Sequence, residues 1–148
     1  MLNQNETVEF NFLFDSEWTS TPPVIEIRNN NQQVVAPMIV DGKQTVRCLI
    51  EMLPGQKNSV LKIVRSNHDE QTHQLCQLVE LKADDINLDP ILDHTEFYPQ
   101  YPRIWHQEQV LLGKEWPLFH KGWLSWGWNG SWQMKYYTPF YDWLLRKI

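Results

Sequence analysis

Hydrophobic and polar residues alternate along the first half of the chain, in short runs separated by polar or Pro/Gly-containing segments. The run Thr7–Phe14 reads TVEFNFLF, so its valine and three phenylalanines all fall on one face of an extended chain. A period of two is typical of a β-strand with one buried face. Further strands are predicted over PVIEIR, VVAPMIV, Gln44–Leu53, Ser59–Arg65 and Leu75–Leu81. The residues predicted to be buried include Val8, Phe10, Phe12, Val46, Cys48 and Ile50.

Turn signals separate these runs. Asp41-Gly42 is a turn signal of the hairpin kind, and Pro37 places VVAPMIV at a sheet edge or a bulge. Short strands with turns between them favour an all-β fold, an antiparallel β-sandwich of the jelly-roll or carbohydrate-binding-module type. Residues 1–148 are predicted to form one domain, with a sandwich body over 1–82 and an acidic and aromatic extension over 83–148.

The extension contains a second strong turn signal, Asn129-Gly130, between two tryptophan-rich runs. A two-residue hairpin turn there pairs Gly127 with Trp132 and Trp126 with Gln133, and paired residues share a face. The predicted core face of this aromatic hairpin carries Trp123, Ser125, Gly127, Trp132, Met134 and Tyr136. The other face carries Leu124, Trp126, Trp128, Ser131, Gln133 and Lys135.

Trp126 and Trp128 are the predicted functional residues, with Gln133 and Lys135 beside them on the same face. Two interpretations stay open, because the polar second strand cannot bury two indoles by itself. In the first, the terminal helix or the FYPQYP segment covers both rings within the chain. In the second, the rings form an exposed patch for a protein partner or a glycan, two uses that suit a rigid, amphipathic indole.

A terminal helix is expected in the extension, and a second segment is either helical or irregular. Thr138-Pro139 predicts the start of a short terminal helix, with Thr138 as N-cap and Pro139 in the first position. Phe140, Trp143 and Leu144 then share one face. Arg103–Gly113 is predicted to be a short helix or an irregular excursion.

Charge is unevenly distributed along the chain. The net charge of −5 argues against nucleic acid as a partner. Residues 1–102 carry 7 basic and 15 acidic side chains, whereas residues 103–148 carry 6 basic and 3 acidic ones. The basic C-terminal part either packs onto the acidic body or meets a neighbour of complementary charge. No apolar run approaches the ~20 residues of a membrane span, and the N-terminus lacks the pattern of a secretory signal. We therefore expect a protein assembled in a cytoplasm, with no membrane partner.

Candidate chemistry is sparse. Cys48 and Cys76 are expected to be buried thiols. The acidic stretch Asp84–Asp93 could offer oxygen ligands to calcium, but it lacks the spacing of an EF-hand loop, so we interpret it as a turn-forming run. The five histidines show no zinc-binding spacing, and no catalytic signature is present. We expect no metal, no cofactor and no catalytic residue, and hence a protein that is not an enzyme.

The segments DHTEFYPQYPRIW, GWLSWGWNGSW and YYTPFYDWLL together resemble a group of small proteins encoded by tailed bacteriophages, notably those of marine cyanobacteria. In that group a β-sandwich precedes a tyrosine/proline stretch, a W-N-G hairpin and a terminal S/T-P-x-Y-x-W-L-L helix. The resemblance covers residues 85–148 and implies a virion protein: a decoration, neck or tail component that contacts other virion proteins or copies of itself. The alternative is a carbohydrate-binding module directed at the host surface through exposed tryptophans.

Overall fold

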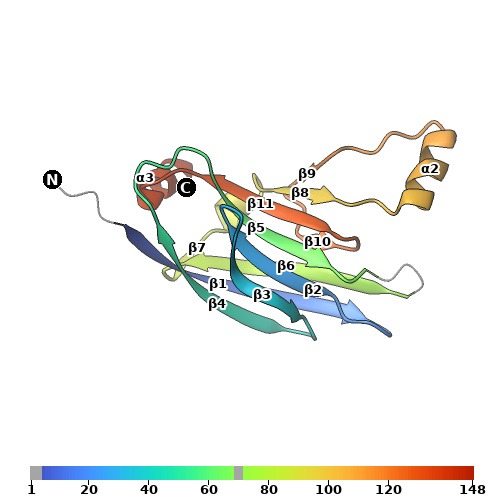
Figure 1. Cartoon of the computed structure of the whole chain (residues 1–148), viewed down its shortest axis with the longest axis horizontal. Coiled ribbons are helices and arrows are strands. Elements are labelled where there is room, and N and C mark those ends of the chain that lie inside the picture. Colours follow the sequence, from blue (N-terminus) through green and yellow to red (C-terminus); the bar gives the residue numbers. More distant parts are fainter. Residues whose placement is uncertain (1–4, 69–71) are drawn as a thin grey trace.

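The computed structural model describes residues 5–68 and 72–148, which form two antiparallel β-sheets packed face to face (Figure 1). Sheet A runs in the order β10 (Ser125–Trp126), β6 (Gln74–Ala83), β1 (Glu6–Trp18) and β4 (Gln44–Met52), with β7 (Ile86–Asn87) beside β6. Sheet B runs in the order β3 (Gln32–Ile39), β2 (Val24–Asn29), β5 (Ser59–Ser66), β11 (Gly130–Tyr136), β8 (Glu96–Pro99) and β9 (His120–Lys121). The predicted all-β sandwich is confirmed.

The predicted alternation places one face of each long strand in the core between the sheets. β1 buries its valine and phenylalanines, and β4 buries every second residue from Val46 to Met52. All six residues predicted to be buried are buried. β3, which contains Pro37, lies at the edge of sheet B, where a missing backbone N–H costs no ladder hydrogen bond.

Neither predicted hairpin turn joins two paired strands. Asp41-Gly42 leads from β3 of sheet B to β4 of sheet A, and Asn129-Gly130 leads from β10 of sheet A to β11 of sheet B. β11 instead pairs with β5 and β8, and β10 pairs with β6. The predicted aromatic hairpin is therefore wrong. A local turn signal specifies only that the chain changes direction. The strands that pair with β10 and β11 are distant in sequence.

Residues 83–148 contribute strands to both sheets, so residue 82 does not bound the sandwich. This part of the chain also contains α1 (Asp89–Leu92) and α2 (Arg103–Leu111), and α2 decides between the two alternatives left open for Arg103–Gly113 in favour of a short helix. None of the helices in the described ranges is long and apolar enough to cross a membrane.

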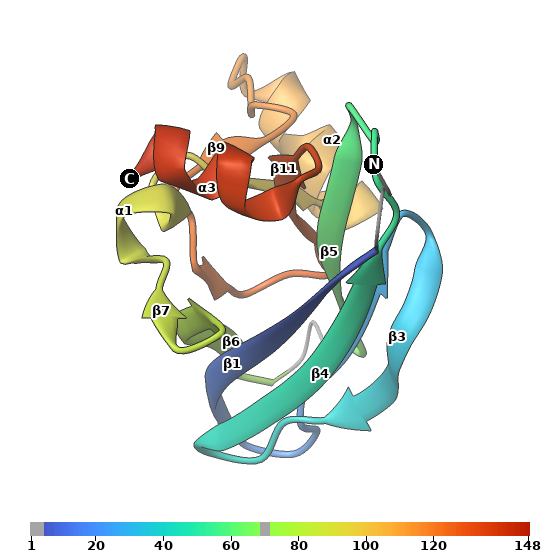
Figure 2. The same cartoon turned by 90° about the vertical axis from the view of Figure 1, so that its left-hand side faces the viewer.

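The terminal helix, α3 (Phe140–Lys147), lies across one end of the sandwich (Figure 2). Its predicted apolar face is confirmed, since Phe140, Trp143 and Leu144 are buried. The predicted N-cap is wrong. The Thr138 hydroxyl accepts a hydrogen bond from the Gln56 N–H and donates one to the Leu53 carbonyl, both at 2.8 Å. Thr138 thus ties α3 to a distant loop, and its side chain is no longer available to cap the helix.

Candidate functional site

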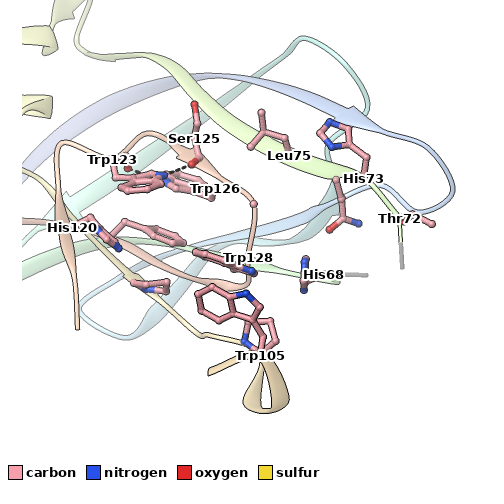
Figure 3. Close-up of a pocket in the computed structure, with 15 residues that line it drawn as sticks. His68, Thr72, His73, Leu75, Trp105, His120, Trp123, Ser125, Trp126 and Trp128 are labelled. Atoms are coloured by element: carbon pink, nitrogen blue, oxygen red, sulfur yellow. Dashed lines mark hydrogen bonds between the residues drawn. The ribbon is translucent and has the colours of Figure 1, made fainter. Parts of the chain in front are cut away.

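A pocket of about 830 Å³ opens at the end of the sandwich opposite α3 (Figure 3). Four chain segments form it: the residues around the start of β6, strand β8, the start of α2, and the stretch from His120 to Trp128. Figure 3 shows Trp105 and Trp128 on one side of the hollow, with His73 and Leu75 on the other. Both predicted tryptophans, Trp126 and Trp128, contribute to the pocket wall.

Trp126 is a core residue. Its side chain is fully buried, and its ring stacks on Phe97 with a centroid distance of 5.3 Å and an interplanar angle of 6°. The indole N–H donates a hydrogen bond to the Trp123 carbonyl at 2.8 Å. Phe97 belongs to the FYPQYP segment, so the interpretation that this segment covers the ring is right for Trp126. The expectation that Trp126 forms an exposed patch is wrong.

Trp128 is half-buried in a group of rings that we call the arm-base cluster, which comprises Tyr101, Trp105, Trp116 and Trp128. The Trp128 ring lies 5.3 Å from Tyr101 and 5.1 Å from Trp105, centroid to centroid. Trp116 completes the cluster at 5.1 Å from Trp105. FYPQYP therefore covers Trp128 only in part, and the remaining surface of the ring faces the pocket.

Gln133 and Lys135 lie elsewhere, on the outward face of β11. They line a second hollow with the cationic side chains of Lys121, Arg146 and Lys147. Lys135 forms an ion pair of 3.0 Å with Glu96. The structure thus divides the predicted four-residue site into two places. The physical reason is that β10 and β11 belong to different sheets, so no shared face exists to bring the residues together.

The tryptophans of the predicted core face also differ from one another in burial. Trp132 is buried as predicted, with its indole N–H bonded to the Thr95 hydroxyl at 2.8 Å. Trp123 is 43% exposed and lines the pocket, contrary to the prediction. The predicted contact of Trp132 with Gly127 is absent, because a Cβ at Gly127 would meet no atom within 4 Å. In β10 the inward position is Trp126, which reverses the assignment made from hairpin pairing.

Arg65 positions the pocket wall and was not singled out from the sequence. Its guanidinium is buried, and its Nη1 donates a hydrogen bond to Asn129 Oδ1 at 3.1 Å. The same oxygen accepts the backbone N–H of His68 at 2.8 Å. Burial lowers the pKa of Arg65. In SVLKIVR, Arg65 is two residues after Ile63 and so falls on the same inward face of the strand. This position in the alternation could have identified Arg65 from the sequence.

His120 contributes a neutral imidazole to the wall. Its ring lies 4.3 Å from the Trp123 ring, and its Nε2 is 3.1 Å from the Tyr101 hydroxyl. Burial lowers the pKa of His120 below its usual value, so the ring is uncharged at neutral pH. The Tyr101 hydroxyl also donates to the Pro117 carbonyl at 2.8 Å. This bond fastens residue 117 to the base of the cluster.

Residues 100–119, which we call the arm, leave the sandwich between the paired strands β8 and β9 and carry α2 away from it (Figure 1). α2 buries none of its residues. Of fifteen large hydrophobic side chains exposed in the described part of the chain, seven belong to the arm: Ile104, Val110, Leu111, Leu112, Trp116, Leu118 and Phe119.

The other candidate residues have structural roles. Cys48 and Cys76 are buried free thiols as predicted, and burial raises their pKa values to about 11 and about 12. Asp84 accepts hydrogen bonds from the Glu9 N–H and the Tyr141 hydroxyl, so it fastens the turn after β6. Within residues 5–68 and 72–148, no three His, Cys, Asp or Glu side chains are grouped to hold a metal ion.

Comparisons with known proteins give no assignment. No family model, no curated protein and no solved structure matches this chain. Any function must therefore be argued from the arm, the pocket and the residues that hold them.

Proposed function

We propose that this protein is a non-enzymatic structural or accessory subunit that binds a protein partner through its arm. The observation that supports this most is the concentration of exposed apolar side chains in residues 100–119. A concentration of exposed apolar side chains in one short segment is typical of a protein interaction site. An amphipathic helix that lays its apolar side chains into the groove of a partner is also a recurrent recognition mode.

The arm combines an anchored base with an uncovered tip. Tyr101, Trp105 and Trp116 hold the base against Trp128. Toward the end of α2, Leu111 is 86% exposed and Leu112 is 69% exposed. A helix this short gains little stability from its own hydrogen bonds, so an apolar face without a covering surface favours association. The partner would bury these two leucines.

The assembly that we propose is a virion. The resemblance of residues 85–148 to small proteins of tailed phages supports this setting. The arm lies inside that range: it begins within the tyrosine/proline stretch and ends before the W-N-G segment. The partner would then be another virion protein or a second copy of this chain, in a decoration, neck or tail position.

The proposal is tested by replacing Leu111 and Leu112 together with serine in a phage that encodes the chain. Quantitative mass spectrometry of purified virions measures how much of the protein is incorporated. We expect incorporation to fall at least about tenfold, because loss of central apolar anchors costs more than ~1.4 kcal/mol of binding. The isolated variant should unfold at the wild-type temperature, since neither side chain is buried.

A matched control is the double replacement of Leu49 and Leu53 with serine. These leucines are exposed to a similar extent, 65% and 57%, but lie on or just after β4, far from the arm in sequence. The control should enter the virion at wild-type levels. Equal incorporation of the arm variant and the wild type would refute the proposal.

A further inference from the structure

The pocket beside the arm base has the dimensions of a ligand site. Its volume of about 830 Å³ falls within the ~300–1,000 Å³ typical of clefts that hold small molecules. It lies between elements of both sheets, because β6 and β10 belong to sheet A and β8 belongs to sheet B. The walls are therefore fixed by the sandwich itself, and not by the arm alone.

Three indole rings present surface to this pocket. Trp123 is the most exposed of them, and Trp105 and Trp128 are half-buried. Figure 3 shows that they come from different parts of the wall, so a ring-shaped ligand could contact more than one indole. Indole faces attract groups whose C–H bonds carry a slight positive charge, because the π-face is negative. The axial C–H faces of a sugar ring have this property.

Hydrogen-bonding groups accompany the rings. The indole N–H groups of Trp105 and Trp128 make no hydrogen bond with any residue that the structure describes. Ser125 adds a hydroxyl group to the same wall, and His73 adds an imidazole whose Nε2 lies 3.3 Å from Glu17 Oε2. A ligand that offers several hydroxyls beside an apolar face could pair with these groups and lie against the indoles at the same time.

The described residues of the lining also include no aspartate, glutamate, lysine or arginine. His120 is neutral at ordinary pH because burial lowers its pKa. An ionic ligand would lose hydration in such a pocket without gaining a counter-charge, which makes a neutral ligand the better fit.

We infer that this pocket binds a neutral saccharide, with Trp123 and Trp128 as the stacking residues. Trp126 and Arg65 act as positioning residues. Trp126 forms the buried support behind Trp123, and Arg65 donates a hydrogen bond to Asn129, whose Oδ1 also accepts the His68 N–H. This ligand site is separate from the tip of the arm, so it goes beyond the proposed protein contact and does not depend on it.

The experiment is to probe the full-length protein with an array of neutral and acidic oligosaccharides, followed by calorimetric titration with the neutral glycan that gives the strongest signal. Trp123→Ala should weaken that binding at least about tenfold, which corresponds to ~1.4 kcal/mol. Trp128→Ala should weaken it as well, and Trp123→Phe should restore part of the affinity. The thermal midpoint of each variant shows whether it is folded.

The Leu111→Ser/Leu112→Ser variant is the control. Neither leucine lines the pocket or belongs to the arm-base cluster, and both side chains are largely exposed. This variant should bind the saccharide as the wild type does. The inference is overturned by any of three results: no neutral glycan bound on the array, binding to acidic glycans only, or affinity unchanged in Trp123→Ala and Trp128→Ala.

Discussion

Gly130 is the glycine at which an added Cβ would have least room. A Cβ there would lie 2.4 Å from the Tyr98 carbonyl oxygen and 2.7 Å from Cζ of Phe97. Both atoms belong to β8, the strand that pairs with β11 at this point. The glycine of Asn129-Gly130 is therefore required for a close approach between neighbouring strands. The sequence instead predicted that this glycine serves a two-residue hairpin turn.

Gly130→Ala should destabilise the protein by ~1–3 kcal/mol, the usual cost of forcing extra atoms into a packed region. Gly127→Ala is the control, since its Cβ would meet nothing within 4 Å, and the change in its free energy of unfolding should be less than ~0.5 kcal/mol. Urea unfolding of the two variants measures both values. A Gly130→Ala protein as stable as the wild type would contradict the observed pairing of β11 with β8.

His120 should make stability depend on pH. Its pKa is lowered in the folded state by burial, so the unfolded chain binds the proton more readily. The stability contributed by the neutral ring is complete above the unfolded pKa of ~6.5 and is lost as pH falls through the lowered folded value. Between about pH 7 and pH 5, His120→Gln should lose less stability than the wild type. Urea unfolding across this pH range measures the two slopes. Parallel slopes would show that protonation of His120 is not linked to folding.

At the scale of elements, the N-terminus of α3 is capped by a side chain from the other end of the chain. The Phe140 N–H donates a hydrogen bond to Glu6 Oε1 at 2.6 Å, so a carboxylate of β1 caps the helix across 134 positions of sequence. A carboxylate at this position also complements the partial positive charge of the helix N-terminus. The same contact ties the first strand to the last helix.

Glu6→Ala should destabilise the protein by ~0.5–2 kcal/mol, as the loss of a helix cap does. Hydrogen exchange at the Phe140 amide should become faster, because its acceptor is gone. Glu17→Ala serves as the control: its side chain is 73% exposed and, among the described residues, pairs with an exposed histidine, so its effect should stay below ~0.5 kcal/mol. An unchanged exchange rate at Phe140 would argue against capping by Glu6.

At the scale of the whole molecule, Trp126 joins the two layers of the sandwich. Trp126 belongs to β10 of sheet A, and its indole stacks on the ring of Phe97, which belongs to β8 of sheet B. The stacked pair lies behind the pocket and continues the core of phenylalanines and isoleucines that fills the space between the sheets. The sandwich and the pocket therefore share a wall.

Trp126→Ala should lower the free energy of unfolding by ~3–5 kcal/mol, as expected when a fully buried ring is removed. Trp123→Ala removes a ring that is 43% exposed and should cost no more than ~1 kcal/mol. Chemical denaturation of the two variants gives the comparison. If both cost the same, the difference in burial between these neighbouring tryptophans would be disproved.

The sequence by itself determined the strands, the inward residues and the apolar face of the terminal helix. These features follow from the spacing of hydrophobic residues over a few neighbouring positions. Alternate residues of a strand, and residues three or four apart in a helix, lie on the same side, so the spacing alone shows which side is buried. It also singled out Trp126 and Trp128, two of the four tryptophans that line the pocket, although it grouped them with Gln133 and Lys135 of a different surface.

The tertiary structure alone decided which strands pair and where each turn leads. Trp132 lies beside Ile63 and Phe97, and Trp126 beside Cys76, so the partners of these two nearby residues come from separate sheets. The residues of a turn contain no information about which distant strands will pair with the strands on either side of it. For the same reason the sequence could not tell which indole would be covered: Trp126 is buried by a strand about thirty positions away, whereas Trp123 and Trp128 remain open to the pocket.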